Sequence, residues 1–217
     1  MKALFIQDIR YMLTQKSFLF LIVFIGIVLS LTQNDNYLFV IGYLGFMGMI
    51  TGMMSLTMDD QSHGLAFLFS LPIDRRTYVR EKYLFVVFMG VVFSLFATAV
   101  CLLFRVFADY KAPTDEILAT AVGTTCVMLL FICFMLPLQL KFGAERARLA
   151  SFIAIGFFFV AVLLAGLVIN FADALPFIQA FLSMSPVALA GIGAAFLIVC
   201  LRISYGVSLR IILHREF

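Results

Sequence analysis

Six long apolar stretches, separated by short polar connectors, dominate the pattern of hydrophobic and polar positions along this chain. Each stretch approaches the roughly 20 residues that an α-helix needs to cross the hydrocarbon core of a bilayer. A segment within lipid must satisfy its backbone hydrogen bonds internally, so we expect all six to be helices. The pattern therefore predicts an all-α, polytopic membrane protein with six transmembrane helices. The predicted spans are Phe18–Leu31, Tyr37–Met58, Tyr83–Phe107, Ile117–Leu140, Leu149–Phe171 and Pro186–Tyr205.

Two further segments differ from the spans. Residues 1–16 place apolar side chains at helical spacing with charges elsewhere, which predicts an elbow helix lying in the membrane interface. Residues 173–186 are longer than the other connectors on their side, and predict either a short interfacial helix or a re-entrant hairpin. The other connectors on that side are too short to fold separately. We therefore expect residues 1–217 to form a single transmembrane domain.

Composition and charge place this domain in a membrane and orient it. Hydrophobic residues make up 64% of the chain and charged residues only 12%, which is too apolar for a water-facing surface. All but two of the 15 Lys and Arg residues fall on one side of the membrane. The positive-inside rule predicts that this side, with both termini, is cytoplasmic, as in a bacterial inner-membrane protein. Because topology already explains the basic residues, we expect no nucleic-acid binding.

The chain shows no constellation typical of an enzyme. The four cysteines lie inside apolar stretches without zinc-ligand spacing, and His63 and His214 are isolated, so we expect no metal site. Asp59 and Asp60 are adjacent, and on a helix they would point about 100° apart, unlike an acid/base pair. No span has an acidic residue, Lys or His near its middle, which argues against an ion-coupled carrier.

The largest cytoplasmic connector, residues 59–82, contains an apolar run that ends at Pro72. A short helix with such an apolar face must lie on the membrane, pack under the other helices, or dock onto a cytoplasmic partner. An interfacial helix with basic anchors is the simplest interpretation from physical chemistry alone. A coupling function requires further evidence.

Motifs in this connector and at the end of the chain resemble those of a known family. The order Gly64-Leu65, Leu68, Ser70-Leu71-Pro72-Ile73, Arg75, Val79 and Lys82-Tyr83 resembles the cytoplasmic loop of permease subunits of type-2 ABC transporters. The end of the chain, Ser204–Ile211 and Arg215–Phe217, resembles the closing extension of the same family. The six-span plan matches over essentially the whole chain. Asp74 departs from the family pattern, in which a small or neutral residue is more common.

The resemblance implies that residues 59–82 hold a cytoplasmic coupling helix seated on a separate P-loop ATPase. Two copies of this ATPase would bind ATP and magnesium, since this chain lacks the GxxxxGK[ST] motif and binds no cofactor itself. Arg75 and Arg76 would pair with acidic groups of the ATPase or with lipid phosphates. The other implied docking residues are Gly64, Leu65, Phe67, Leu68, Leu71 and Pro72.

The second span combines glycine, methionine and small hydroxyl residues. Small residues permit close helix approach, so tight packing within one subunit is the ordinary interpretation. The resemblance offers another, in which this span and the fifth line a translocation path and methionine adapts to the cargo. The candidate path residues are Met47, Gly48, Thr51, Met54, Ser55, Phe157 and Phe158.

Together these observations predict a permease subunit of an ATP-driven ABC exporter, surrounded by membrane lipid and paired with a second permease, most simply as a homodimer. A path without buried charge suits a hydrophobic or amphipathic substrate, and the resemblance suggests export of a cytolytic or antimicrobial peptide. The alternative is a non-transporting membrane scaffold or sensor that recruits a cytoplasmic partner.

Overall fold

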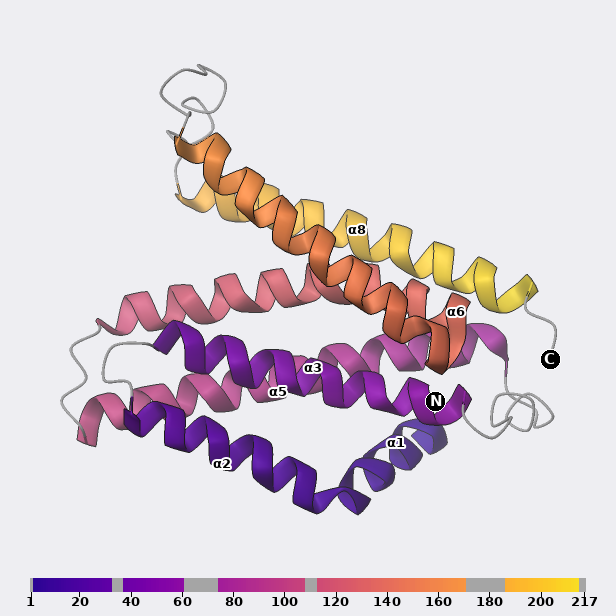
Figure 1. The fold of residues 1–217 in the computed structure, drawn as a ribbon, viewed down its shortest axis with the longest axis horizontal. Helices are drawn as coiled ribbons and strands as arrows, with labels where there is room; N and C mark the ends of the chain where they lie inside the picture. Colours follow the sequence, from indigo (N-terminus) through magenta and orange to yellow (C-terminus); the bar gives the residue numbers. More distant parts are fainter. Residues whose placement is uncertain (1, 33–36, 61–73, 108–112, 171–185, 215–217) are drawn as a thin grey trace.

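The computed structural model describes residues 2–32, 37–60, 74–107, 113–170 and 186–214, and their backbone is almost entirely helical, as the sequence predicts. No strand occurs within these ranges. Figure 1 shows how the helices are arranged. In chain order they are α1 (Lys2–Thr14), α2 (Lys16–Thr32), α3 (Tyr37–Asp60), α5 (Arg75–Phe107), α6 (Thr114–Asn170) and α8 (Pro186–His214).

Four helical segments of the described chain are long and apolar enough to cross a membrane: Tyr37–Asp60, Arg75–Val106, Thr114–Gly143 and Gly193–His214. The bent pair formed by α1 and α2, whose axes differ by 72°, makes a fifth if it is counted as one span. The backbone of the fifth predicted span, Leu149–Phe171, is helical up to Asn170 and belongs to the second part of α6.

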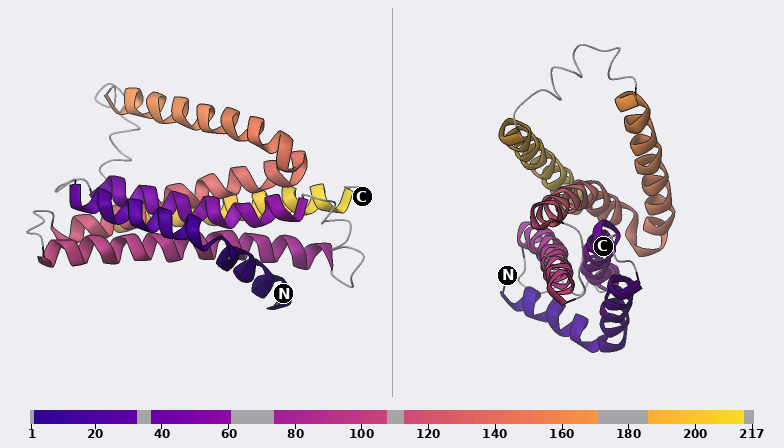
Figure 2. Two further views of the ribbon diagram at one scale, coloured as in Figure 1. Left: turned by 60° about the horizontal axis from the view of Figure 1, so that its bottom comes forward. Right: turned by 90° about the vertical axis from the view of Figure 1, so that its left-hand side faces the viewer.

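Helix α6 consists of two limbs joined at Gly143, which has φ 72° and ψ 177°. Glycine tolerates this positive φ because it has no Cβ atom to clash with the backbone. Figures 1 and 2 show the limb after Gly143 turning back along the bundle, away from α3 and α5. The chain therefore changes direction at this glycine, which divides α6 into two helices.

The centre of the bundle is formed by α3, α5 and the first limb of α6, with α2 and α8 on either side of it (Figures 1 and 2). Two glycines bring α3 against α5. A Cβ atom on Gly48 would lie 2.4 Å from the Phe93 Cβ atom, and one on Gly52 would lie 3.0 Å from the Val86 Cα atom. Because neither position has room for a side chain, these glycines serve helix packing.

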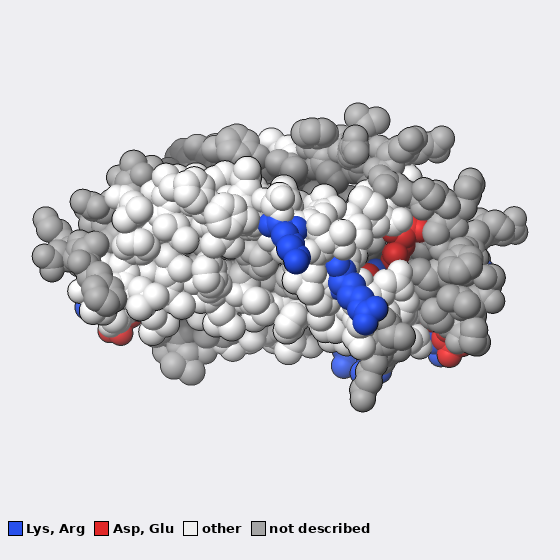
Figure 3. Space-filling view, turned by 90° about the horizontal axis from the view of Figure 1, so that it is seen from below, with Lys and Arg blue, Asp and Glu red and all other residues white. Residues whose placement is uncertain are grey.

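Large apolar side chains cover the outside of the bundle. Examples are Phe20, Leu95 and Val106, which are exposed by 71%, 65% and 76%. Figure 3 shows a broad area without charged side chains on the face that α2 covers. An apolar surface of this extent is typical of a protein that contacts lipid.

Two helix boundaries differ from those predicted. Helix α5 begins at Arg75, eight residues before the predicted span at Tyr83, and α3 continues through Asp59 and Asp60. The polar residues at these helix ends were assigned to the connector 59–82 because they are unfavourable in lipid. In the folded chain several of them are satisfied by other helices, so the helices extend further.

Candidate functional site

A buried ion cluster lies at the end of the bundle where α3 ends and α5 begins, called here the loop end. The Lys82 Nζ atom on α5 lies 2.6 Å from Asp8 Oδ2 on α1 and 2.8 Å from Asp59 Oδ2 on α3. The Lys82 side chain is only 1% exposed. The cluster therefore ties three helices together away from solvent.

Two hydroxyl groups complete the cluster. Ser55 Oγ accepts a hydrogen bond from Lys82 Nζ at 2.9 Å and donates one to Asp8 Oδ2 at 3.1 Å. The Tyr78 hydroxyl donates to Asp59 Oδ2 at 3.1 Å. An ammonium group has three hydrogens, and Lys82 directs all three to partners, namely Asp8, Asp59 and Ser55.

Glu81, next to Lys82, is the least satisfied member of this cluster. Its side chain is 2% exposed, its Oε2 atom lies 3.9 Å from Lys82 Nζ, and neither carboxylate oxygen has a hydrogen-bond partner within the described chain. Three carboxylates thus approach one ammonium group. A buried carboxylate without full compensation is costly, so the fold is sensitive to a change of charge among these buried groups.

The local sequence explains how the cluster forms. Ser55 and Asp59 are four residues apart and share one face of α3, and Tyr78 and Lys82 share one face of α5 in the same way. Asp8 lies on the buried face of α1, one turn after buried Leu4. Sequence reasoning placed Asp8 on the polar side of that helix and counted Lys82 among the connector bases. The polar i, i+4 pairs were the signal that it missed.

The first turns of α5 also bind α8. Ser204 on α8 donates its hydroxyl hydrogen to the backbone oxygen of Cys133 on α6. The Tyr83 hydroxyl must therefore donate to Ser204 Oγ, at 2.6 Å, and accept from Ser208 Oγ, at 2.8 Å. This relay of hydroxyl groups connects α5, α6 and α8.

Arg75 adds a second link to α8. Its Nη1 atom donates to the backbone oxygens of Ile212 and Leu213, at 2.8 and 2.9 Å. The last carbonyls of a helix lack partners in the helix itself, and a basic side chain can satisfy them. We call Arg75, Tyr78, Lys82 and Tyr83 the α5 hub, because together they bind α1, α3 and α8.

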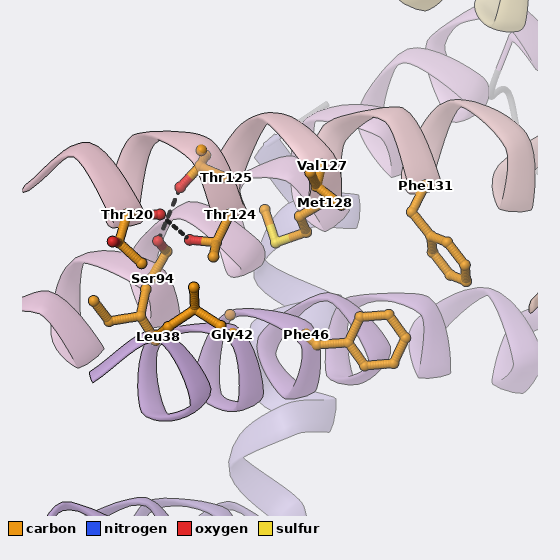
Figure 4. A pocket seen from close by; sticks show the side chains of 13 residues that line it. Leu38, Gly42, Phe46, Ser94, Thr120, Thr124, Thr125, Val127, Met128 and Phe131 are labelled. Atoms are coloured by element: carbon orange, nitrogen blue, oxygen red, sulfur yellow. Dashed lines mark hydrogen bonds between the residues drawn. The ribbon is translucent and has the colours of Figure 1, made fainter. Parts of the chain in front are cut away.

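A cavity of about 510 Å³ lies between α3, α5 and the first limb of α6. Figure 4 shows its hydroxyl side chains near Leu38 and the rings of Phe46 and Phe131 toward its other end. The lining is mainly apolar. Its residues are Leu38, Ile41, Gly42, Gly45, Phe46, Ser94, Thr120, Gly123, Thr124, Thr125, Val127, Met128 and Phe131.

The family model for the ABC-2 family transporter protein matches residues 3–212. This chain belongs to the ABC-2 transporter family. No curated protein and no solved structure matches it. Family membership and the membrane-spanning helices together identify a multi-pass integral membrane protein that acts as a permease of an ABC transporter.

The expected docking residues of this ABC-2 permease are only partly visible. Gly64, Leu65, Phe67, Leu68, Leu71 and Pro72 lie outside the described residues. Arg76 is exposed at the start of α5. Arg75 is half-buried and bonded to the end of α8, so part of its hydrogen-bonding capacity is used within the permease.

The expected path residues on α3 do not line the cavity. Met47 packs against the apolar core that contains Phe93, and Gly48 faces Phe93 directly. Thr51 donates to the Met47 backbone oxygen at 2.7 Å. Ser55 belongs to the ion cluster.

Met54, another expected path residue on α3, is half-buried and is not among the cavity residues. The side chains of Phe157 and Phe158 lie outside the described part of the chain. The cavity thus uses a different face of α3 from the one that the path prediction selected. In the described residues, no group of three or more His, Cys, Asp or Glu side chains could hold a metal ion.

Proposed function

We propose that this ABC-2 permease is the membrane subunit of an ATP-driven exporter, coupled to its ATPase through the chain between α3 and α5. The observation that carries the proposal is the position of the α5 hub. Residues 61–73 connect Asp59 and Asp60 at the end of α3 to Arg75 at the start of α5. A force on this connection therefore acts directly on the hub.

The hub suits the transmission of such a force. Lys82 and Tyr78 both bind Asp59, so the two helix ends that flank residues 61–73 are bonded to each other. Hydrogen bonds and ion pairs shielded from water are stronger than exposed ones. We expect the ends of α3 and α5 to move as one unit, together with α1 through Asp8 and α8 through Tyr83.

Such a movement would change the cavity, because α3, α5 and α6 form its walls. ATP binding would close two ATPase subunits, pull on residues 64–72 and shift α3 and α5 relative to α6. The proposal includes a second permease copy, most simply a homodimer, in a bacterial inner membrane with both termini in the cytoplasm. The cargo would be hydrophobic or amphipathic, and a cytolytic or antimicrobial peptide is one such molecule.

The test is co-purification from the native host in detergent, with bound proteins identified by mass spectrometry. We expect the wild-type permease to recover a P-loop ATPase, and Leu68→Glu combined with Leu71→Glu to lose it. The matched control is Gln7→Glu, which adds an acidic group at an exposed position of α1 near the same end. All three proteins should elute as the same monodisperse species.

Two results would contradict the proposal. If the folded wild-type protein recovers no ATPase, the chain is better explained as a membrane scaffold or sensor. If the loop variant retains the ATPase, the docking surface lies elsewhere.

A further inference from the structure

Glycines line the cavity between α3 and α6 at positions where most helices carry side chains. A Cβ atom added to Gly42 or to Gly123 would meet nothing within 4 Å, and one on Gly45 would come no closer than 3.8 Å to Ser94. Larger side chains at these positions would therefore occupy the cavity. The cavity is bordered by the backbone of α3 at Gly42 and of α6 at Gly123 and opens to the outside of the bundle beside exposed Leu38 and Val127, which leaves room for a slender ligand.

The cavity is lined by hydroxyl groups at one end and by aromatic rings at the other. The rings of Phe46 and Phe131 contact each other with centroids 5.3 Å apart. Ser94, Thr124 and Thr125 gather near Leu38, at the end where α6 begins (Figure 4). A ligand that matches this arrangement has an apolar chain directed at the rings and a polar group among the hydroxyls.

The hydroxyl groups select the kind of polar group. Thr124 donates to the Thr120 backbone oxygen at 2.8 Å, and Thr125 donates to the Ala121 backbone oxygen at 2.7 Å. Ser94 must then donate to Thr125 Oγ1, at 2.9 Å, because the hydrogen of Thr125 is already used. A ligand therefore meets hydrogen-bond acceptors, and not donors, at these three hydroxyl groups.

The charged residues near the hydroxyl end of the cavity also favour a ligand whose polar group is a hydrogen-bond donor. Asp115 and Glu116 are exposed in the first turn of α6, shortly before Thr120. Arg105, in the last turn of α5, is the cation that the described chain places at this end of the bundle. Within the described chain, two carboxylates against one guanidinium give this end of the bundle a negative balance, which attracts a cationic group.

We propose that this cavity binds the single alkyl chain of an amphiphile whose headgroup is a hydrogen-bond donor, such as a primary alkylamine. The chain lies toward Phe46 and Phe131, and the headgroup meets the oxygens of Ser94, Thr124 and Thr125. Binding at this site needs no ATPase. Its role as the cargo site rests on the export function proposed above.

The absence of tryptophan makes the test direct, because any introduced tryptophan is the only one in the protein. Phe46→Trp places the fluorophore at the aromatic end of the cavity. Phe134→Trp, at a 50% exposed position on the outside of α6, reports ordinary lipid contact. The permease would be placed in phosphatidylcholine nanodiscs and titrated with ω-bromo-undecylamine, whose terminal bromine quenches tryptophan.

We expect saturable quenching at position 46 and a gradual, non-saturating response at position 134. Gly123→Leu and Gly42→Leu, each combined with Phe46→Trp, should abolish the saturable component by filling the cavity. Gly206→Leu on α8 is the matched control, because its Cβ atom also enters open space but lies outside the cavity. Unchanged helical circular dichroism and elution volume establish that each variant has folded.

Two further titrations separate the sources of an alkyl chain. ω-Bromo-undecanoate should bind about tenfold or more weakly than the amine, since it lacks the donor group and carries the opposite charge. Brominated phosphatidylcholine should give only the gradual response at both positions. Equal binding of the carboxylate, or saturable quenching by phosphatidylcholine that the amine does not displace, would overturn the proposal.

The outcomes also separate this site from the export function. Saturable binding in a protein that recovers no ATPase would leave the cavity as an amphiphile site without transport. If the permease recovers an ATPase but shows no saturable quenching at position 46, the exporter proposal stands and this cavity is excluded as its alkyl-chain site.

Discussion

The Nζ atom of Lys82 lies 2.6 Å from the Oδ2 atom of Asp8, although 74 residues separate them in the chain. The contact joins the first helix to the start of α5. Asp59 and Ser55 bind the same ammonium group from α3. One side chain therefore coordinates three helices at the end of the bundle where residues 61–73 connect α3 and α5.

Removing that ammonium group should destabilise the permease strongly. Lys82→Met leaves Asp8 and Asp59 buried without their cation, and breaking a buried ion pair in this way costs about 3–5 kcal/mol. We expect a clear fall in the thermal unfolding temperature in detergent. Arg80→Met, two residues away and exposed, is the matched control and should change little.

The same cluster permits a rescue experiment. Lys82→Met combined with Asp8→Asn and Asp59→Asn removes the two carboxylates that contact the cation directly along with the cation, and leaves only Glu81 of the three. The triple variant should unfold at a higher temperature than Lys82→Met alone. A triple variant less stable than the single one would show that Asp8 and Asp59 stabilise the fold through other contacts.

The close contact of α3 and α5 gives a further prediction. Gly48→Ala introduces a Cβ atom that would lie 2.4 Å from Phe93 Cβ, so the two helices must separate. Overpacking of this kind costs about 1–3 kcal/mol. Gly42→Ala on the same helix meets open space, and should be neutral or stabilising by up to about 1 kcal/mol. Thermal unfolding of the pair measures the difference.

The hydroxyl relay between α5 and α8 can be tested by Tyr83→Phe. This change leaves buried Ser204 and Ser208 without their shared partner, and we expect a loss of about 1–3 kcal/mol. Tyr205→Phe removes a hydroxyl from a neighbouring ring that contacts Tyr83 edge-on, and serves as the control. Equal unfolding temperatures for the two variants would mean that the relay contributes little.

The break in α6 depends on backbone conformation at one residue. Gly143 has φ 72° and ψ 177°, a region that essentially only glycine adopts, and a residue with a Cβ atom is disfavoured there by about 1–3 kcal/mol. Gly143→Ala should therefore lower stability. Gly156→Ala, in the second limb of the same helix where a Cβ atom meets open space, should raise it slightly or leave it unchanged. If Gly156→Ala lowered stability more than Gly143→Ala, the two limbs of α6 would not separate at Gly143.

Much of the fold was accessible from the pattern of apolar residues. The helices around Tyr37–Met58 and Ile117–Leu140 were predicted because lipid permits few alternatives to a helix over such stretches. The helix boundaries were less accessible. Arg75–Lys82 were assigned to a connector, whereas the structure extends α5 through them, because their partners on α1, α3 and α8 are distant in sequence.

The residues of the candidate site were likewise only partly predictable from the sequence. Gly48 and Gly52 were recognised as small residues that allow close approach, but only the structure shows that they face α5. Gly42 and Gly45, on the same helix, line the cavity instead. The spacing of the glycines cannot distinguish these faces, since it does not tell which neighbour each face meets.

The sequence by itself determined that this protein is an all-helical membrane protein and indicated its transporter family, because hydrophobic length and local order are properties of consecutive residues. The tertiary structure decided that Lys82 is an internal cation, that Asp8 is buried, and where the cavity lies. These properties depend on contacts between residues far apart in the chain. Burial in a helical bundle gives such contacts their energetic weight, since a charge removed from water must find its partner in another helix.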